Sequence, residues 1–168
     1  GSCLGLYHIL IQLGHTVQVV SPNEYPDFLA WMPSAEKVLV YESNKVASTT
    51  ALKNAEIIFT LDFNALHRTG MMGDFLKELT VPFVMIDHHE KPDDYAAVTY
   101  SDIHISSTCE MVYLFAQALG WNDFINQTVG TCLYTGMMTD TGSFKYASTT
   151  ASTHRIVAEL KDLGVETA

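Results

Sequence analysis

The sequence predicts an α/β fold: a mostly parallel sheet with helices on both faces. Short apolar, β-prone runs alternate along the chain with longer segments of helical periodicity. Such alternation is typical of parallel sheets that helices cover on both sides. The clearest run, residues 81–86, is apolar throughout, as expected for a strand buried on both faces. It ends in Asp87, His88 and His89, and in open α/β sheets ligands bind beyond the carboxyl ends of the strands.

The composition predicts one folded domain over residues 1–168. Hydrophobic residues make up 48% of the chain, which is far from the composition of disordered proteins. Nineteen acidic and nine basic residues give a formal net charge of -10. This charge argues against broad, sequence-independent binding to long nucleic acid, which needs many basic contacts to phosphates. It leaves a short or small phosphorylated substrate open, because bound divalent cations would reverse the charge locally.

The cysteines and the hydropathy pattern predict a cytoplasmic protein. Cys3, Cys109 and Cys132 are isolated in apolar surroundings, which indicates reduced thiols rather than a disulfide framework or a zinc site. No apolar run reaches the roughly 18 residues of a membrane span, and no basic stretch suggests a signal peptide. We therefore expect no membrane partner.

The first part of the chain reads as alternating helices and strands. Residues 3–13 carry apolar positions at helical spacing, and Gly14 is a natural residue to follow a helix. Because open α/β domains usually begin with a strand, we expect a leading strand and loop before residue 1. The next expected elements are a strand at 16–20, a short amphipathic turn or helix at 25–32, a strand at 37–41, a helix at 43–53 and a strand at 56–61.

The second part continues the pattern and becomes more helical towards its end. Ser107 and Glu110 fit a capping box, in which a hydroxyl caps the new helix and a glutamate three residues on reaches back. The expected elements are a helix at 64–78, a strand at 83–86, a loop with a short edge strand at 91–101, and helices at 107–119, 123–138 and 149–163.

Acidic and histidine side chains recur where apolar segments end. Asp62 follows the strand at 56–61, Asp87 to His89 follow the next strand, and Asp140 follows the apolar helix. Each has a plainer explanation when taken alone: a helix cap, a surface histidine pair and a turn residue. Their recurrence favours one shared site. Several aspartates with a histidine indicate manganese or magnesium more than zinc.

This donor set predicts a metal-dependent phosphoesterase. Two divalent cations held about 3.5–4 Å apart by a carboxylate can activate water and neutralise a phosphoryl group. Ser107 and Thr108 can contact a phosphate at a helix N-terminus, although capping alone explains them. The sequence contains no glycine-rich dinucleotide fingerprint, no Walker phosphate loop and no GxSxG nucleophile elbow.

Four segments, in the same order, resemble motifs of the DHH phosphoesterases, and a fifth, at residues 1–6, resembles the helix that directly follows the family's first motif. The match covers essentially the whole chain, and the segment at 105–110 resembles the nanoRNase/pAp-phosphatase branch in particular. The matching segments are Gly1-Ser-Cys-Leu-Gly-Leu6, Leu61-Asp62-Phe63-Asn64, Asp87-His88-His89, Ile105-Ser-Ser-Thr-Cys-Glu110 and Gly136-Met-Met-Thr-Asp140-Thr-Gly-Ser-Phe144.

The resemblance implies a DHH domain with two Mn²⁺ ions, with Mg²⁺ as the alternative, that cleaves phosphoester bonds. It implies that Asp62 bridges both metals and that His88 and Asp140 complete the second metal's shell. His89 would contact the scissile phosphate or help protonate the leaving group, and Asp87 would orient a histidine. The implied substrates are short oligoribonucleotides and 3′-phosphoadenosine 5′-phosphate. A homodimer is compatible with this interpretation.

Two departures from the family pattern shape what we expect of this chain. The family's first motif would lie just before Gly1, and its smaller substrate-binding domain would follow Ala168. We therefore expect this segment alone to be weakly active or inactive. The alternatives are a cyclic- or linear-dinucleotide phosphodiesterase of the same family and a non-catalytic nucleotide-binding module. A single-strand DNA exonuclease is disfavoured because it would need a basic groove with stacking aromatics.

Overall fold

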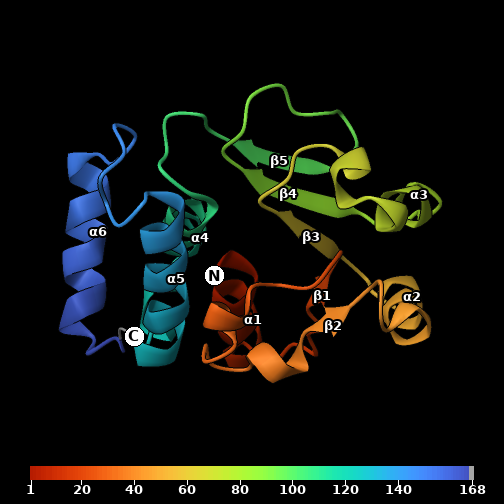
Figure 1. Ribbon diagram of the computed structural model, residues 1–168, viewed down its shortest axis with the longest axis horizontal. Helices are drawn as coiled ribbons and strands as arrows, with labels where there is room; N and C mark the ends of the chain where they lie inside the picture. The colour runs from red at the N-terminus through yellow and green to blue at the C-terminus, as the bar shows by residue number, and fades with distance from the viewer. Residues whose placement is uncertain (167–168) are drawn as a thin grey trace. The chain divides into compact units, whose positions relative to one another are not determined.

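The computed structural model describes residues 1–166, which form two compact units. A helical unit comprises residues 1–17 and 102–166, and a sheet unit comprises residues 18–101. The predicted α/β class is confirmed, because all the strands pair in parallel and helices flank them (Figure 1). That the chain forms a single domain stays a prediction.

The main sheet has the order β3-β4-β5, with β3 at Ile58–Leu61, β4 at Phe83–Asp87 and β5 at Val98–Ser101. Figure 1 shows the three strands side by side. Every residue of the central strand β4 is buried, which confirms the interpretation of its continuous apolar run. The pairs Ile58↔Phe83 and Leu61↔Ile86 fix the register, so β3 and β4 end at the same edge.

The remaining strands are shorter than the sequence predicts and form a separate two-stranded sheet. β1 covers only Val20–Ser21 and β2 only Leu39–Val40. The prediction of a strand from residue 16 is wrong for residues 16–19, since only Val20 and Ser21 have strand partners in β2. The single continuous sheet that we expected is therefore two parallel sheets among the described residues.

Helices of the sheet unit share a hydrophobic core with the main sheet. Three elements flank it: α2 (Lys45–Lys53), the 3₁₀ turn η3 (Leu66–Thr69) and α3 (Met71–Lys77). The 3₁₀ turns η1 (Asp27–Leu29) and η2 (Ala35–Lys37) precede them. The buried residues of this core are Tyr41, Leu52, Ile58, Leu66, Met72, Leu76 and Phe83.

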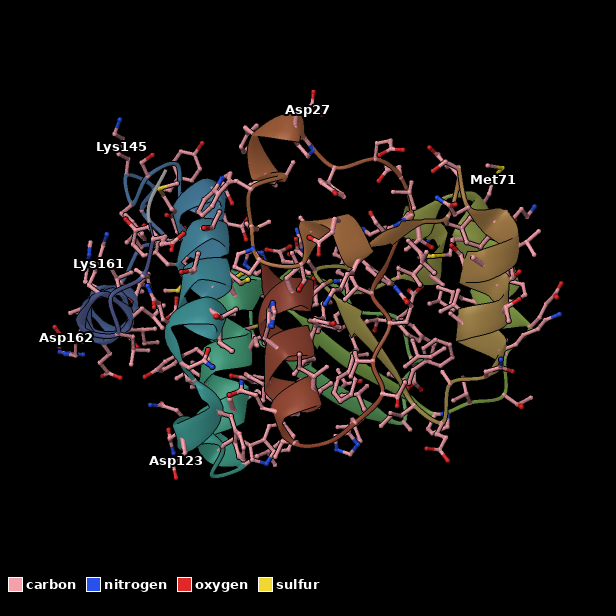
Figure 2. The ribbon with its side chains drawn as sticks, turned by 90° about the horizontal axis from the view of Figure 1, so that it is seen from below. Asp27, Met71, Asp123, Lys145, Lys161 and Asp162 are labelled. Carbon is pink, nitrogen blue, oxygen red and sulfur yellow. The ribbon has the colours of Figure 1, made fainter. Side chains whose placement is uncertain are left out.

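The helix predicted at 64–78 is broken at Gly70. Gly70 has φ 58° and ψ -132°, a conformation that residues with a side chain rarely adopt, so it separates η3 from α3. Met71, the first residue of α3, projects from the surface and is 62% exposed (Figure 2).

The helical unit is built around α5. Its helices are α1 (Ser2–Gln12), α4 (Thr108–Ala118), α5 (Gln127–Asp140) and α6 (Ala151–Asp162), with the 3₁₀ turn η4 at Asn122–Phe124. α5 contacts α1, α4 and α6, and its residues from Val129 to Met137 are buried. The predicted buried helix is confirmed. α6 is amphipathic instead, and Figure 2 shows its last residue, Asp162, at the surface.

The predicted capping box of α4 forms only in part. The Ser107 hydroxyl accepts the backbone N–H of Glu110 at 3.1 Å, as expected for an N-cap. The Glu110 carboxylate does not return to Ser107. It accepts the hydroxyls of Ser106 at 2.5 Å and Thr153 at 2.9 Å, so it ties the start of α4 to the start of α6. The reciprocal box forms at α6 instead, between Thr150 and Thr153.

All three cysteines are thiols, and two of them are buried. Burial raises the pKa of the Cys132 thiol to about 11, so this thiol stays protonated at neutral pH. Among residues 1–166 the structure contains no helix with the length and hydropathy needed to cross a membrane.

A glycine allows α5 to approach α4 closely. A Cβ atom added at Gly136 would lie 2.1 Å from the Sγ of Cys109 and 3.2 Å from the Cα of Gly1. We expect Gly136→Ala to lower the free energy of unfolding by about 1–3 kcal/mol, because overpacking forces helices apart. Urea denaturation would measure this. The cost should shrink in a Cys109→Ala background, and an equal cost in both backgrounds would contradict the steric explanation.

Candidate metal site

The candidate site lies where β3 and β4 end at the same edge of the sheet. Asp62 directly follows β3, and its backbone N–H donates to the carbonyl of Ile86 at 3.2 Å, which extends the strand pairing by one step. His88 directly follows β4. Asp62 has φ 68°, in the left-handed region that aspartate tolerates better than most residues. The parallel register therefore brings the two predicted ligand segments together.

Asp62, His88 and His89 form a cluster that can hold a metal ion. Each offers one ligand atom, and the three atoms lie within 4.8 Å of one another. The Nε2 of His88 is 3.7 Å from the Oδ1 of Asp62. One carboxylate and two imidazoles make a donor set that suits a divalent cation accepting oxygen and nitrogen ligands. The site is accessible, because the Asp62 side chain is 47% exposed and the His88 side chain 20%.

Asp87 binds His89 through both of its carboxylate oxygens. Its carboxylate is fully buried, and its Oδ1 lies 2.8 Å from the Nδ1 of His89. Its Oδ2 accepts the backbone N–H of His89 at 2.8 Å, so both carboxylate oxygens bind the same residue. A carboxylate can only accept, so the imidazole proton belongs on Nδ1 and the lone pair on Nε2. That Asp87 orients His89 for catalysis stays a prediction.

Tyr95 and Thr60 form a partly buried pair in the same sheet unit that we did not select from the sequence. The Tyr95 and Thr60 hydroxyls form a hydrogen bond at 2.7 Å, and the Tyr95 ring packs edge-on against Phe83 with centroids 5.7 Å apart. The pKa of Tyr95 is raised, mainly because burial disfavours the phenolate and also because Asp87 and Asp93 are negative; the Thr60 hydrogen bond acts in the opposite direction. Tyr95 is therefore a neutral phenol at neutral pH.

Asn64 is a second residue whose role the sequence did not reveal. Its side chain is 1% exposed, and its amide Nδ2 donates to the carbonyls of His89 at 3.1 Å and Glu90 at 2.8 Å. The signals in the sequence are its place at the end of the segment Leu61-Asp62-Phe63-Asn64, which resembles a family motif, and its polarity between Phe63 and Ala65.

The other predicted site residues belong to the helical unit. Asp140 is the exposed last residue of α5, and its assignment as a metal ligand stays a prediction from its motif. Ser107 and Thr108 are both buried at the start of α4. The Ser107 hydroxyl serves as the N-cap, and a contact of either residue with substrate stays a prediction.

Comparison with known proteins identifies one family. A family model described as the DHH family, N-terminal domain, matches residues 1–137. The protein named bifunctional oligoribonuclease and PAP phosphatase NrnA from Thermus thermophilus is 30% identical over 172 residues, which cover 100% of this chain and 47% of that protein. The protein of the same name from Bacillus subtilis is 35% identical over 78 residues, covering 45% of this chain and 24% of that protein.

The fold has a similar solved structure. The crystal structure of an exopolyphosphatase-related protein from Bacteroides fragilis matches with a TM-score of 0.95 and 39% identity, over 98% of this chain and 48% of that chain. The chain thus spans about half the length of the Thermus and Bacteroides proteins.

The contact between Asp87 and His89 predicts a single imidazole tautomer. We expect His89 to carry its proton on Nδ1 at neutral pH, and Asp87→Asn to move it largely to Nε2, because an amide group would replace one accepting oxygen. Nitrogen-15 NMR of the histidine rings measures this directly. The exposed His15 is the internal control and should keep the same tautomer populations in both proteins. An unchanged His89 spectrum in the variant would contradict the orienting role.

Proposed function

Because this chain belongs to the DHH family, we propose that it forms the catalytic part of a Mn²⁺-dependent phosphoesterase. We propose that the whole protein hydrolyses short oligoribonucleotides, 3′-phosphoadenosine 5′-phosphate or both. The observation that carries this proposal is the cluster of Asp62, His88 and His89 at one sheet edge, with Asp87 bonded to His89. The names of the Thermus and Bacillus relatives support the substrate class.

The charge of the chain supports metal dependence. The net charge is -10. Asp62 directly follows β3 and Asp87 is the last residue of the neighbouring strand β4, so the protein alone would repel an anionic phosphate here. Bound divalent cations would supply positive charge for the phosphoryl oxygens and lower the pKa of a bound water. Asp62 is the proposed bridging carboxylate and His88 a proposed ligand through Nε2.

His89 is proposed to act on the substrate. With its proton held on Nδ1 by Asp87, His89 would offer the lone pair of Nε2 to a proton and could pass that proton to a leaving oxygen. Asp87 would keep the imidazole in this orientation, while its complete burial keeps it from contacting the substrate itself. The two residues thereby divide proton transfer and orientation between them.

The proposal predicts a metal requirement and a dependence on Asp62. We expect the full-length protein to hydrolyse 3′-phosphoadenosine 5′-phosphate or a short RNA with Mn²⁺, to lose activity after treatment with a chelator and to recover it when Mn²⁺ is added. Asp62→Asn should lower kcat/KM by at least about 100-fold, since it removes a negative ligand. Asparagine has the same size and also tolerates the positive φ of this position, so the fold should be kept. Product release followed by chromatography measures both effects.

Asp74→Asn is the matched control for this variant. Asp74 is an exposed aspartate of α3 that pairs with Lys77 at 3.0 Å, and its loss should change turnover by less than about twofold because exposed ion pairs contribute little. Near-normal turnover by Asp62→Asn would refute the proposed bridging ligand. Tight Mn²⁺ binding without turnover of these substrates or of a linear dinucleotide would favour the nucleotide-binding module instead.

A further inference from the structure

Asn64 joins the two segments that carry the candidate ligands. It lies two residues after Asp62, in the connection from β3 to η3. Its side-chain amide donates two hydrogen bonds across to the segment that follows β4, at the carbonyls of His89 and Glu90. Its backbone carbonyl accepts a third hydrogen bond from the N–H of Asp93 at 2.8 Å. A single buried residue therefore connects both sides of the site.

The hydrogen bond from Asn64 adds a second restraint on the backbone of His89. The N–H of His89 donates to Asp87 at 2.8 Å, and the carbonyl of His89 accepts from Asn64 at 3.1 Å. Both peptide groups that flank the imidazole are thus held by side chains. His88, the proposed metal ligand, directly precedes His89 in the chain. Metal ligands must keep their distances within about 0.2 Å, so the backbone of this segment needs such a restraint.

The chemistry of the asparagine side chain suits this task. The amide has two N–H donors, and both are used on carbonyl oxygens. The side chain is 1% exposed, so water cannot readily replace a lost bond, and an amide buried without partners would be unfavourable. An aspartate of the same size would instead place an acceptor against two acceptors.

We propose that Asn64 is a positioning residue, which sets the separation between Asp62 and the two histidines by holding the segment after β4 against the segment after β3. This inference rests on the proposed function, because it concerns the same metal site. Asn64 acts through the backbone of His89 and Glu90, and it contacts neither metal nor substrate in this role.

The test compares two Asn64 variants with a variant of a neighbouring buried side chain. Asn64→Asp reverses the donors, and Asn64→Ala removes them without adding repulsion. Thr69→Val is the matched control: Thr69 is also buried, and its hydroxyl donates to the carbonyl of Leu66 at 2.7 Å within η3. The control removes a buried side-chain-to-backbone bond of the same connection but leaves the segment after β4 untouched.

The measurements are the Mn²⁺ dissociation constant by electron paramagnetic resonance, kcat and KM at saturating Mn²⁺, and the melting temperature of the full-length protein. Both Asn64 variants should weaken Mn²⁺ binding and lower kcat by about 10- to 100-fold, with a smaller change in KM. Thr69→Val should shift the melting temperature but change Mn²⁺ affinity and kcat by less than about twofold, because it is independent of the ligands.

The outcomes separate this inference from the proposed function. Folded Asn64 variants with the Mn²⁺ affinity and kcat of the wild type would overturn it, as would a control that loses metal as strongly as they do. Failure of both variants to fold would overturn it too, since the amide would then be needed by the whole sheet unit. If the wild type binds Mn²⁺ without turning over any substrate, the proposed function fails, while the metal-affinity comparison still decides the role of Asn64.

Discussion

The in-register parallel pairing of β3 with β4 is the constraint on which the candidate site depends. Because Leu61 pairs with Ile86, the residues that follow both strands emerge at one edge, and Asp62 comes within 3.7 Å of His88. A slip of one residue would turn the alternating side chains of a strand to its other face. The apolar sequence of β4 and the core beside it therefore determine the geometry of the polar site as well as the stability of the sheet.

Polar contacts then refine what the strand pairing establishes. Asp87 binds the imidazole and the N–H of His89, and Asn64 binds its carbonyl, so one half-buried histidine is restrained by two buried side chains. Buried hydrogen-bonded networks of this kind specify a single arrangement, because each unmet donor or acceptor would be costly. Glu110 has a comparable place in the helical unit, where it ties α4 to α6 through two hydroxyls.

The parts of the structure that depend on local pattern were predictable from the sequence. The apolar run before Asp87 predicted a buried strand, and the helical periodicity around residue 130 predicted the buried helix α5. The parts that depend on distant partners were not. Asn64 stands in a motif-like segment, but nothing in the sequence shows its bonds to residues 89 and 90. The hydrogen bond from Thr153 to Glu110 likewise spans 43 positions in the sequence. β1 is short because its pairing with β2 extends over only two residues.

The backbone of Asp62 has a consequence for how this protein can change over evolutionary time. A φ of 68° restricts the position to residues that adopt left-handed geometry at low cost, chiefly aspartate, asparagine and glycine. Only the first of these carries a negative charge. In a lineage without selection for hydrolysis, asparagine or glycine can therefore replace Asp62 without unfolding the protein. Given the metal-bridging role proposed for Asp62, such descendants would keep an intact sheet and a histidine pair without hydrolytic activity. The shape of the fold alone would then be a poor guide to activity among them.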